Sequence, residues 1–155
     1  MVDVVDAATR SRMMSGIRGR NTKPEIQLRS GLHALGYRFR LHAKGLPGKP
    51  DIVLPKYRAV VLVHGCFWHR HQGCRYATTP ATRTEFWSEK FAGNVLRDAR
   101  NASLIKSAGW RLATVWECAL RSDGGHEVAR LVSEWLRSDR TELEIPSCLL
   151  TERSG

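Results

Sequence analysis

Hydrophobic and polar positions in the first half of the chain predict one helix followed by three strands. Leucines recur at i, i+4 and i+7 between Thr22 and Gly36, which is the spacing of a helix that buries one face. Apolar and polar residues then alternate over residues 37–42, as in a half-buried strand. Two runs that begin at Asp51 and Ala59 predict adjacent central strands, because each is short, apolar and bounded by turn residues.

The second half of the chain adds further helices and one more strand. Residues 64–81 have no regular pattern and are rich in His, Cys and aromatic side chains. The pattern then predicts a long helix over residues 84–108, an apolar strand over 110–116 and a last helix with one apolar face over 128–136. Residues 139–155 are expected to form a tail. This order predicts a single α/β domain for the whole chain, with a mixed central sheet flanked by helices.

Composition favours a folded protein with a polyanionic partner. Hydrophobic residues make up 42% of the 155 residues, which is enough for a core and excludes a fully disordered chain. Lys and Arg outnumber Asp and Glu by 25 to 15, so the formal net charge is +10. A balance this basic in one small domain is typical of proteins that bind nucleic acid.

The basic N-terminal segment, residues 1–23, has few apolar positions. It is interpreted either as a solvated tail or as an arm that grips DNA phosphates. The arginines that would make these contacts are Arg10, Arg12, Arg18 and Arg20. The chain has neither an apolar run of the ~20 residues needed to cross a bilayer nor the apolar region of a secretion signal. A cytoplasmic protein without a membrane partner is therefore expected.

A cysteine and histidine pattern indicates a structural zinc site. The ligands would be Cys66, His71, Cys74 and Cys118. Three thiolates and one imidazole form a common closed tetrahedral Zn²⁺ site, in which one loop supplies three ligands and a distant strand end supplies the fourth. His69 and Cys148 remain alternatives for the fourth ligand, and unrelated buried cysteines remain an alternative to any site.

Acidic and histidine residues at strand ends point to hydrolytic chemistry. Asp51 begins one strand, and the neighbouring strand ends at His64. Carboxylates there could bind a hard divalent cation such as Mg²⁺, although a cap or turn role is the alternative. The spacing resembles the PD-(D/E)-x-K nuclease pattern, with Leu62-x-His64 in place of the second acid and the lysine. His69 and Asp98 are a second candidate pair, as a general base and the carboxylate that orients it.

Aromatic residues in this region suggest contacts with nucleic-acid bases. Phe67 and Trp68 lie in a polar loop where core packing is difficult, which favours base stacking or insertion between bases. Trp87, Asn94 and Asp98 lie on the same face of the predicted long helix.

Together these residues carry a family resemblance that extends from about residue 7 to residue 136. The motifs are Gly65-Cys-Phe-Trp-His69, His71, Cys74, Ala81-Thr-Arg-Thr-Glu-Phe-Trp87, Asn94, Asp98 and Val115-Trp-Glu-Cys118. They closely resemble the very-short-patch-repair (Vsr) DNA mismatch endonucleases. The resemblance implies a restriction-endonuclease-like fold. It also implies an enzyme that nicks one DNA strand 5′ of the thymine in T:G mismatches, which arise when 5-methylcytosine is deaminated.

The same resemblance implies roles for individual residues. Asp51 and the backbone carbonyl of Val63 would bind Mg²⁺, and Glu25 and His64 would hold metal-bound waters. His69, oriented by Asp98, would be the general base. Phe67, Trp68 and Trp87 would insert beside the mismatch, with Asn94 and the N-terminal arm as further DNA contacts. The structural zinc would be held by the four ligands given above.

The expected partner is duplex DNA that contains a T:G mismatch, with repair-pathway proteins as further candidates. A monomer is expected, because an asymmetric lesion needs one cut. Two alternatives remain: a restriction-like nuclease that cuts matched duplex, and a zinc-stabilised DNA-binding module without catalysis.

Overall fold

Five strands form one mixed sheet. In order across the sheet they are β1 (Arg40–Leu41), β2 (Ile52–Leu54), β3 (Ala59–His64), β4 (Arg111–Trp116) and β5 (Glu142–Ile145). This computed structural model describes residues 22–43, 45–123 and 125–146. β1, β2 and β3 pair antiparallel, whereas β4 lies parallel to both β3 and β5. The mixed sheet and its flanking helices confirm the α/β prediction.

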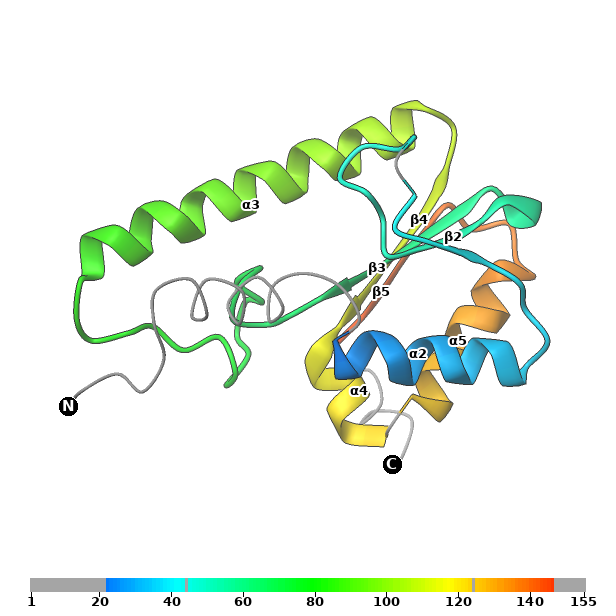
Figure 1. Cartoon of the computed structure of the whole chain (residues 1–155), viewed down its shortest axis with the longest axis horizontal. Coiled ribbons are helices and arrows are strands. Elements are labelled where there is room, and N and C mark those ends of the chain that lie inside the picture. The colour runs from blue at the N-terminus through cyan, green and yellow to red at the C-terminus, as the bar shows by residue number, and fades with distance from the viewer. Residues whose placement is uncertain (1–21, 44, 124, 147–155) are drawn as a thin grey trace, which may run out of the picture.

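Helices cover both faces of this sheet (Figure 1). On one face lie α2 (Lys23–Ala34), α4 (Glu117–Asp123) and α5 (His126–Leu136). On the other lies α3 (Thr84–Ser107), which connects the parallel strands β3 and β4 and projects well beyond the sheet (Figure 1). A short 3₁₀ turn, η1 (Pro55–Tyr57), joins β2 to β3.

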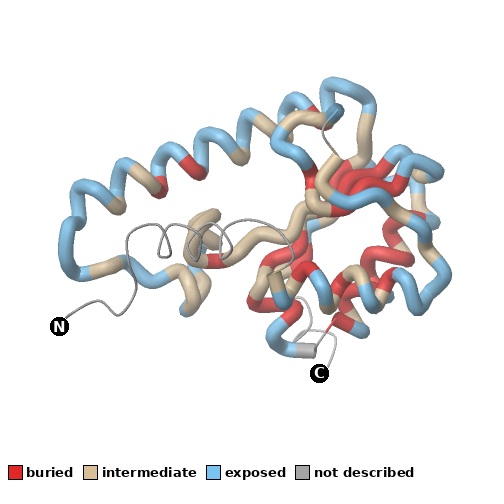
Figure 2. The backbone as a smooth tube through the Cα atoms, in the orientation of Figure 1, coloured by how far each residue is buried: buried red, intermediate tan, exposed pale blue. Residues whose placement is uncertain are grey.

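The alternation of strand residues explains the two layers. Val61 packs in the larger core with Trp135 of α5, while its neighbour Val60 packs on the opposite face with Ile105 of α3. Burial is concentrated in the sheet and in α2, α4 and α5, whereas α3 is exposed along most of its length (Figure 2). The half of α3 that projects therefore borders the irregular segment 64–81 instead of a hydrophobic core.

The predicted start of α2 and the predicted end of α3 are confirmed. Thr22 caps α2, where its hydroxyl oxygen accepts the Glu25 backbone N–H at 3.4 Å. Helix α3 ends before Gly109, whose φ of +87° suits glycine and reverses the chain into β4.

The prediction of a strand over residues 37–42 is correct only in part. Only Arg40 and Leu41 pair with β2, because β2 offers just three residues to the sheet. Tyr37 and Phe39 pack against the larger core as expected, but Leu41 is 42% exposed instead of buried.

The prediction that residues 139–155 form a tail was wrong for the part that the structure describes. Residues 142–145 form β5, which adds to the sheet beside β4 and buries Ile145 completely. Helix α4 was also missed, since it follows Trp116 without a turn residue or a cap that would signal a helix start.

Segment 64–81 is irregular, as predicted, and lies between β3 and α3. Cys66 is the one fully buried hydrophobic residue of the segment. Among the described residues, no helix combines the length and apolar character needed to span a membrane.

Candidate functional site

A carboxylate pair lies where β2 begins and β3 ends. The backbone N–H of Val63 donates to Asp51 Oδ2 at 2.7 Å, which fixes the carboxylate against the end of β3. Glu25 is buried in the first turn of α2, at 2% exposure. Candidate ligand atoms of Glu25, His42 and Asp51 all lie within 4.8 Å of one another, so these three side chains could hold a metal ion.

Two residues that the sequence analysis did not single out hold Glu25 in place. Arg29 Nη2 donates to Glu25 Oε2 at 2.6 Å, and His42 Nε2 lies 3.3 Å from the same oxygen. The i, i+4 spacing of Glu25 and Arg29 on a predicted helix could have indicated this ion pair. No sequence pattern indicates the contact of His42 with Glu25, because His42 lies after β1 and reaches Glu25 only through the fold.

The environment of Asp51 disfavours its charge. Burial is the main cause and the negative charge of Glu25 the second, and together they raise the pKa of Asp51 from 3.8 to about 7. Burial and the neighbouring carboxylate both disfavour a negative charge on Asp51, and a bound metal cation would offset both effects.

A histidine pair lies beside this carboxylate group. His69 Nδ1 is 2.6 Å from Asp98 Oδ2, which holds the first part of the irregular loop against α3. The two side chains are about 31% and 24% exposed, so the pair is accessible to a substrate. The predicted pairing of His69 with Asp98 is confirmed, and it directs the second ring nitrogen, Nε2, away from the carboxylate.

His64 is the last residue of β3 and lies next to this pair. Its ring stacks on that of His69, with centroids 4.0 Å apart, and meets Trp116 edge-on. Burial first and the proximity of His69 second lower the pKa of His64 to about 3. His64 is therefore neutral at physiological pH and can donate or accept a hydrogen bond without adding charge.

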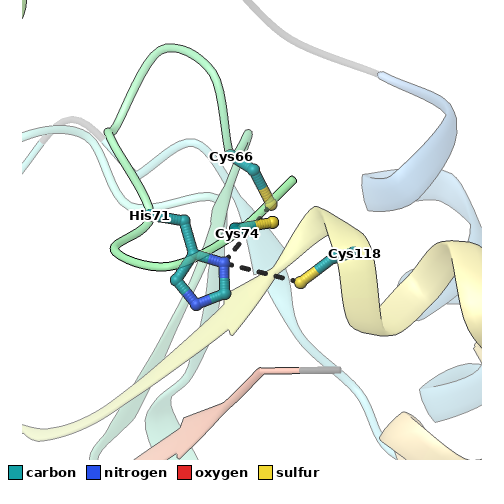
Figure 3. Close-up of side chains that lie close together, drawn as sticks. All are labelled: Cys66, His71, Cys74 and Cys118. Carbon is teal, nitrogen blue, oxygen red and sulfur yellow. Dashed lines mark hydrogen bonds between the residues drawn. The ribbon is translucent and has the colours of Figure 1, made fainter. Parts of the chain in front are cut away.

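The predicted Cys/His cluster is assembled (Figure 3). Cys66 and Cys118 sulfur atoms lie 3.6 and 3.5 Å from His71 Nδ1, and Cys74 completes a group whose ligand atoms lie within 4.8 Å of one another. For comparison, metal–ligand distances of about 2.3 Å to sulfur and about 2.0 Å to nitrogen give tetrahedral S···N separations of about 3.5 Å. The cluster could therefore hold a metal with little rearrangement.

Chemical surroundings also suit a metal at this cluster. Burial raises the pKa of the Cys66 thiol and lowers that of His71, so a nearby cation is needed to stabilise a thiolate here. Trp116 stacks on His71 at 4.2 Å between centroids. The alternative ligand His69 is paired with Asp98 instead, and the alternative Cys148 lies outside the described residues.

An aromatic group forms between the irregular loop and the projecting part of α3. Phe67 lies 4.9 Å from Trp68, 5.7 Å from Trp87 and 5.2 Å from Phe91, measured between ring centroids. Asn94 is 8% exposed, and its side-chain amide donates to the Trp68 carbonyl at 3.0 Å. Asn94 thus supports the loop, while its predicted contact with DNA stays a prediction.

A cleft of about 640 Å³ lies at the carboxylate and histidine pairs. Its lining includes the carboxylate pair, the His69–Asp98 pair, Phe67 and Trp68. Residues far apart in the sequence thus place acidic, basic and aromatic groups along one surface. The four arginines of the predicted N-terminal arm lie outside the described residues.

Comparisons of the sequence with known proteins show the family of the chain. A model of the family described as DNA mismatch endonuclease Vsr matches residues 2–75. The DNA mismatch endonuclease Vsr of Escherichia coli is 51% identical over 121 residues, which cover 78% of this chain and 77% of the relative. The chain belongs to the Vsr family of DNA mismatch endonucleases. Membership in the Vsr family confirms the resemblance seen in the sequence.

Other Vsr relatives carry names that refer to nicking. The type II nicking enzyme V.XorIIP of Xanthomonas oryzae is 50% identical over 131 residues, covering 84% of this chain and 95% of the relative. The type II nicking enzyme V.NmeAIP of Neisseria meningitidis is 41% identical over 122 residues, covering 79% and 86%. As a Vsr-family endonuclease the chain acts on DNA, and its net charge of +10 suits a polyanionic substrate.

Proposed function

We propose that this Vsr-family enzyme hydrolyses one phosphodiester bond 5′ of the thymine in a T:G mismatch, with Mg²⁺ as the catalytic metal and Zn²⁺ in the Cys/His cluster. The observation that carries the proposal is the shared cleft, which is lined by a carboxylate pair, a histidine–carboxylate pair and aromatic rings. A restriction-endonuclease-like fold, a monomer and a cytoplasmic location are parts of the same proposal. Contact with repair-pathway proteins stays a prediction.

The catalytic metal would be bound by Asp51 and the Val63 carbonyl, with Glu25 and His64 holding its waters. The oxygen-rich donor set suits a hard divalent cation, and the raised pKa of Asp51 supports a cation at this place. When bound, the ion neutralises charge that develops on the scissile phosphate and lowers the pKa of a water. The protein's part is to hold the two carboxylates, through Val63 N–H on Asp51 and through Arg29 on Glu25.

His69 is proposed as the group that takes the proton from the attacking water. The bond between Nδ1 and Asp98 fixes the ring so that Nε2 is the proton-accepting atom. His64, stacked on His69, keeps the ring from rotating out of this position.

Replacing His69 with alanine is expected to slow nicking by about 10²–10⁴-fold, because a positioned general base contributes a factor of this size. Binding to the mismatched duplex should change little, since the rings that would insert lie on Phe67, Trp68 and Trp87. Single-turnover nicking rates and equilibrium binding without Mg²⁺ measure the two effects separately. Asp98→Asn should give a smaller loss, and a nicking rate for His69→Ala equal to that of the wild type would refute its role.

The rings proposed to insert beside the mismatch are those of Phe67, Trp68 and Trp87. A mismatched step is weakly stacked, so separating its bases costs less than in a matched duplex, whereas each ring gains a similar stacking energy in either case. The rings therefore select the mismatch through deformability as well as base contacts.

Divalent-cation binding is expected to strengthen as the pH rises to about 7 and to level off above it. Because the pKa of Asp51 is raised to about 7, a proton competes for this carboxylate at lower pH, and the apparent affinity should fall by up to about tenfold per pH unit. Titration with Mn²⁺ followed by electron paramagnetic resonance at several pH values measures this. An affinity that stays constant between about pH 5.5 and about pH 8, a range that brackets the raised pKa of Asp51, would contradict the prediction.

The activity is tested by a nicking assay on labelled duplexes that carry T:G, U:G or C:G at the centre, in several flanking contexts, with and without Mg²⁺. A Mg²⁺-dependent nick confined to the thymine strand of the T:G duplex is the expected result. Equal cutting of the C:G duplex would indicate a restriction-like nuclease. Tight mismatch binding without any cut would indicate a non-catalytic DNA-binding module.

A further inference from the structure

Arg70 makes an unusual set of contacts within the irregular loop. Its side chain donates to three backbone carbonyls and one hydroxyl. The acceptors are Phe67 O at 3.2 Å, Thr78 O at 2.9 Å, Ala77 O at 3.1 Å and Thr79 Oγ1 at 3.0 Å. Four of the five N–H donors of the guanidinium are thus used within the loop itself. The side chain therefore joins the start of the loop to its later part.

The same guanidinium lies on the aromatic group. Arg70 Cζ is 3.9 Å from the centre of the Phe91 ring and 5.8 Å from that of Phe67. Phe91 is 7% exposed and contacts both Phe67 and Trp87, so it forms the base on which these half-buried rings rest. A planar guanidinium can stack on a ring and donate hydrogen bonds along its edges at the same time, which a lysine ammonium cannot.

Two neighbouring carbonyls of the inserting residues are held by side chains. Arg70 binds the Phe67 carbonyl, and Asn94 of α3 binds the next one, that of Trp68. Arg70 itself has a φ of +53°, in the left-handed region that residues other than glycine seldom adopt. A residue keeps such a conformation where its surroundings fix it, as these contacts do.

We propose that Arg70 is a positioning residue that holds Phe67 and its neighbouring rings ready for insertion, and that the preference of the enzyme for mismatched DNA depends on it. This inference rests on the proposed function, because it assumes that the rings insert at the mismatch. Rings that are ordered before binding lose less conformational freedom on insertion, so more of the stacking energy goes to recognition.

The test compares Arg70→Met and Arg70→Lys with the matched control Arg75→Met. Methionine keeps the unbranched apolar stem of Arg70 but lacks the guanidinium and its donors, and lysine keeps the charge without the planar fork. Arg75 lies on the same loop, is exposed and contacts Tyr76 instead of the aromatic group, so Arg75→Met removes the same charge nearby. Each variant is assayed for kcat/KM on T:G and C:G duplexes and for its zinc content.

A second measurement reports on insertion directly. The T:G duplex carries 2-aminopurine beside the mismatch, and its fluorescence rises when the neighbouring base is unstacked at saturating protein without Mg²⁺. A role confined to loop stability would not change this signal in a protein that retains its zinc.

The ratio of kcat/KM for T:G over C:G is expected to fall by at least about tenfold in Arg70→Met and by less in Arg70→Lys. The fluorescence rise should fall in the same order, and Arg75→Met should match the wild type. If Arg70→Met loses its zinc, Arg70→Lys decides the question. If the Arg70 variants keep the wild-type T:G over C:G ratio and the wild-type fluorescence rise, the role of Arg70 is overturned and the proposed function is unaffected. A wild-type enzyme without preference for T:G would overturn the proposed function and this inference with it.

Discussion

Replacing Asp51 with asparagine is expected to reduce nicking by about three orders of magnitude or more. Asparagine can accept the Val63 N–H bond that the carboxylate accepts now, so the local backbone should persist. Asparagine lacks the charge that would bind the catalytic cation. Without the cation, several kcal/mol of transition-state charge stabilisation is lost, which corresponds to a rate effect of this size. Single-turnover nicking of a T:G duplex in Mg²⁺ measures the change.

Stability measurements separate this loss from misfolding. The pKa of Asp51 is raised from 3.8 to about 7, so its ionisation destabilises the metal-free fold as the pH rises through that range. Asp51→Asn should therefore melt at the same temperature as the wild type or higher at pH 8 without metal, and wild-type nicking in this variant would refute the assignment. Asp139→Asn, at an exposed position, is the matched control and should keep full activity.

Replacing Cys118 with serine is expected to have the largest effect on stability. Cys118 is 2% exposed at the start of α4, and its sulfur lies 3.5 Å from His71 Nδ1. Serine is a poor ligand for zinc, so the variant should lose the proposed ion and more than about 4 kcal/mol of unfolding free energy. Metal analysis of purified protein, together with denaturant unfolding, measures both quantities.

The matched control for this experiment is Cys148→Ser, the same change at the remaining cysteine of the chain. It should keep about one zinc ion per chain and the stability of the wild type. Zinc lost from Cys148→Ser and retained in Cys118→Ser would assign the fourth ligand to Cys148 instead. Wild-type protein without zinc would remove the structural metal from the proposal.

The sequence predicted those elements whose ends carry a local signal. Helix α2 has a threonine cap, and α3 ends at a glycine, so both were found with nearly correct bounds. Strand β5 was missed because it has four residues, two of which are exposed, and it is stabilised by pairing with β4. Such a strand depends on a distant neighbour and has little pattern of its own.

The candidate site shows the same division. The Cys/His cluster was found because its residue types and spacing are distinctive, whereas the pairing of His69 with Asp98 was implied by the family resemblance. The surroundings of Glu25 were not found, since His42 reaches it from another loop. The contacts of Arg70 were also missed, because hydrogen bonds to backbone carbonyls depend on how the loop folds and leave no pattern in residue types.

The parallel pairing of β3 with β4 has a consequence for the folding kinetics of the enzyme. Ala59 pairs with Arg111 and His64 with Trp116, so the strands can meet only after the loop and the whole of α3 have been brought back over the sheet. Contacts between residues this far apart in the chain require loop-closure entropy to be lost before they contribute stability, which slows folding. Cys66 and Cys118 each lie two residues after the end of a paired strand. A metal held by both cysteines would therefore bind late in folding. Its main effect would be to lower the unfolding rate, with a smaller effect on the folding rate.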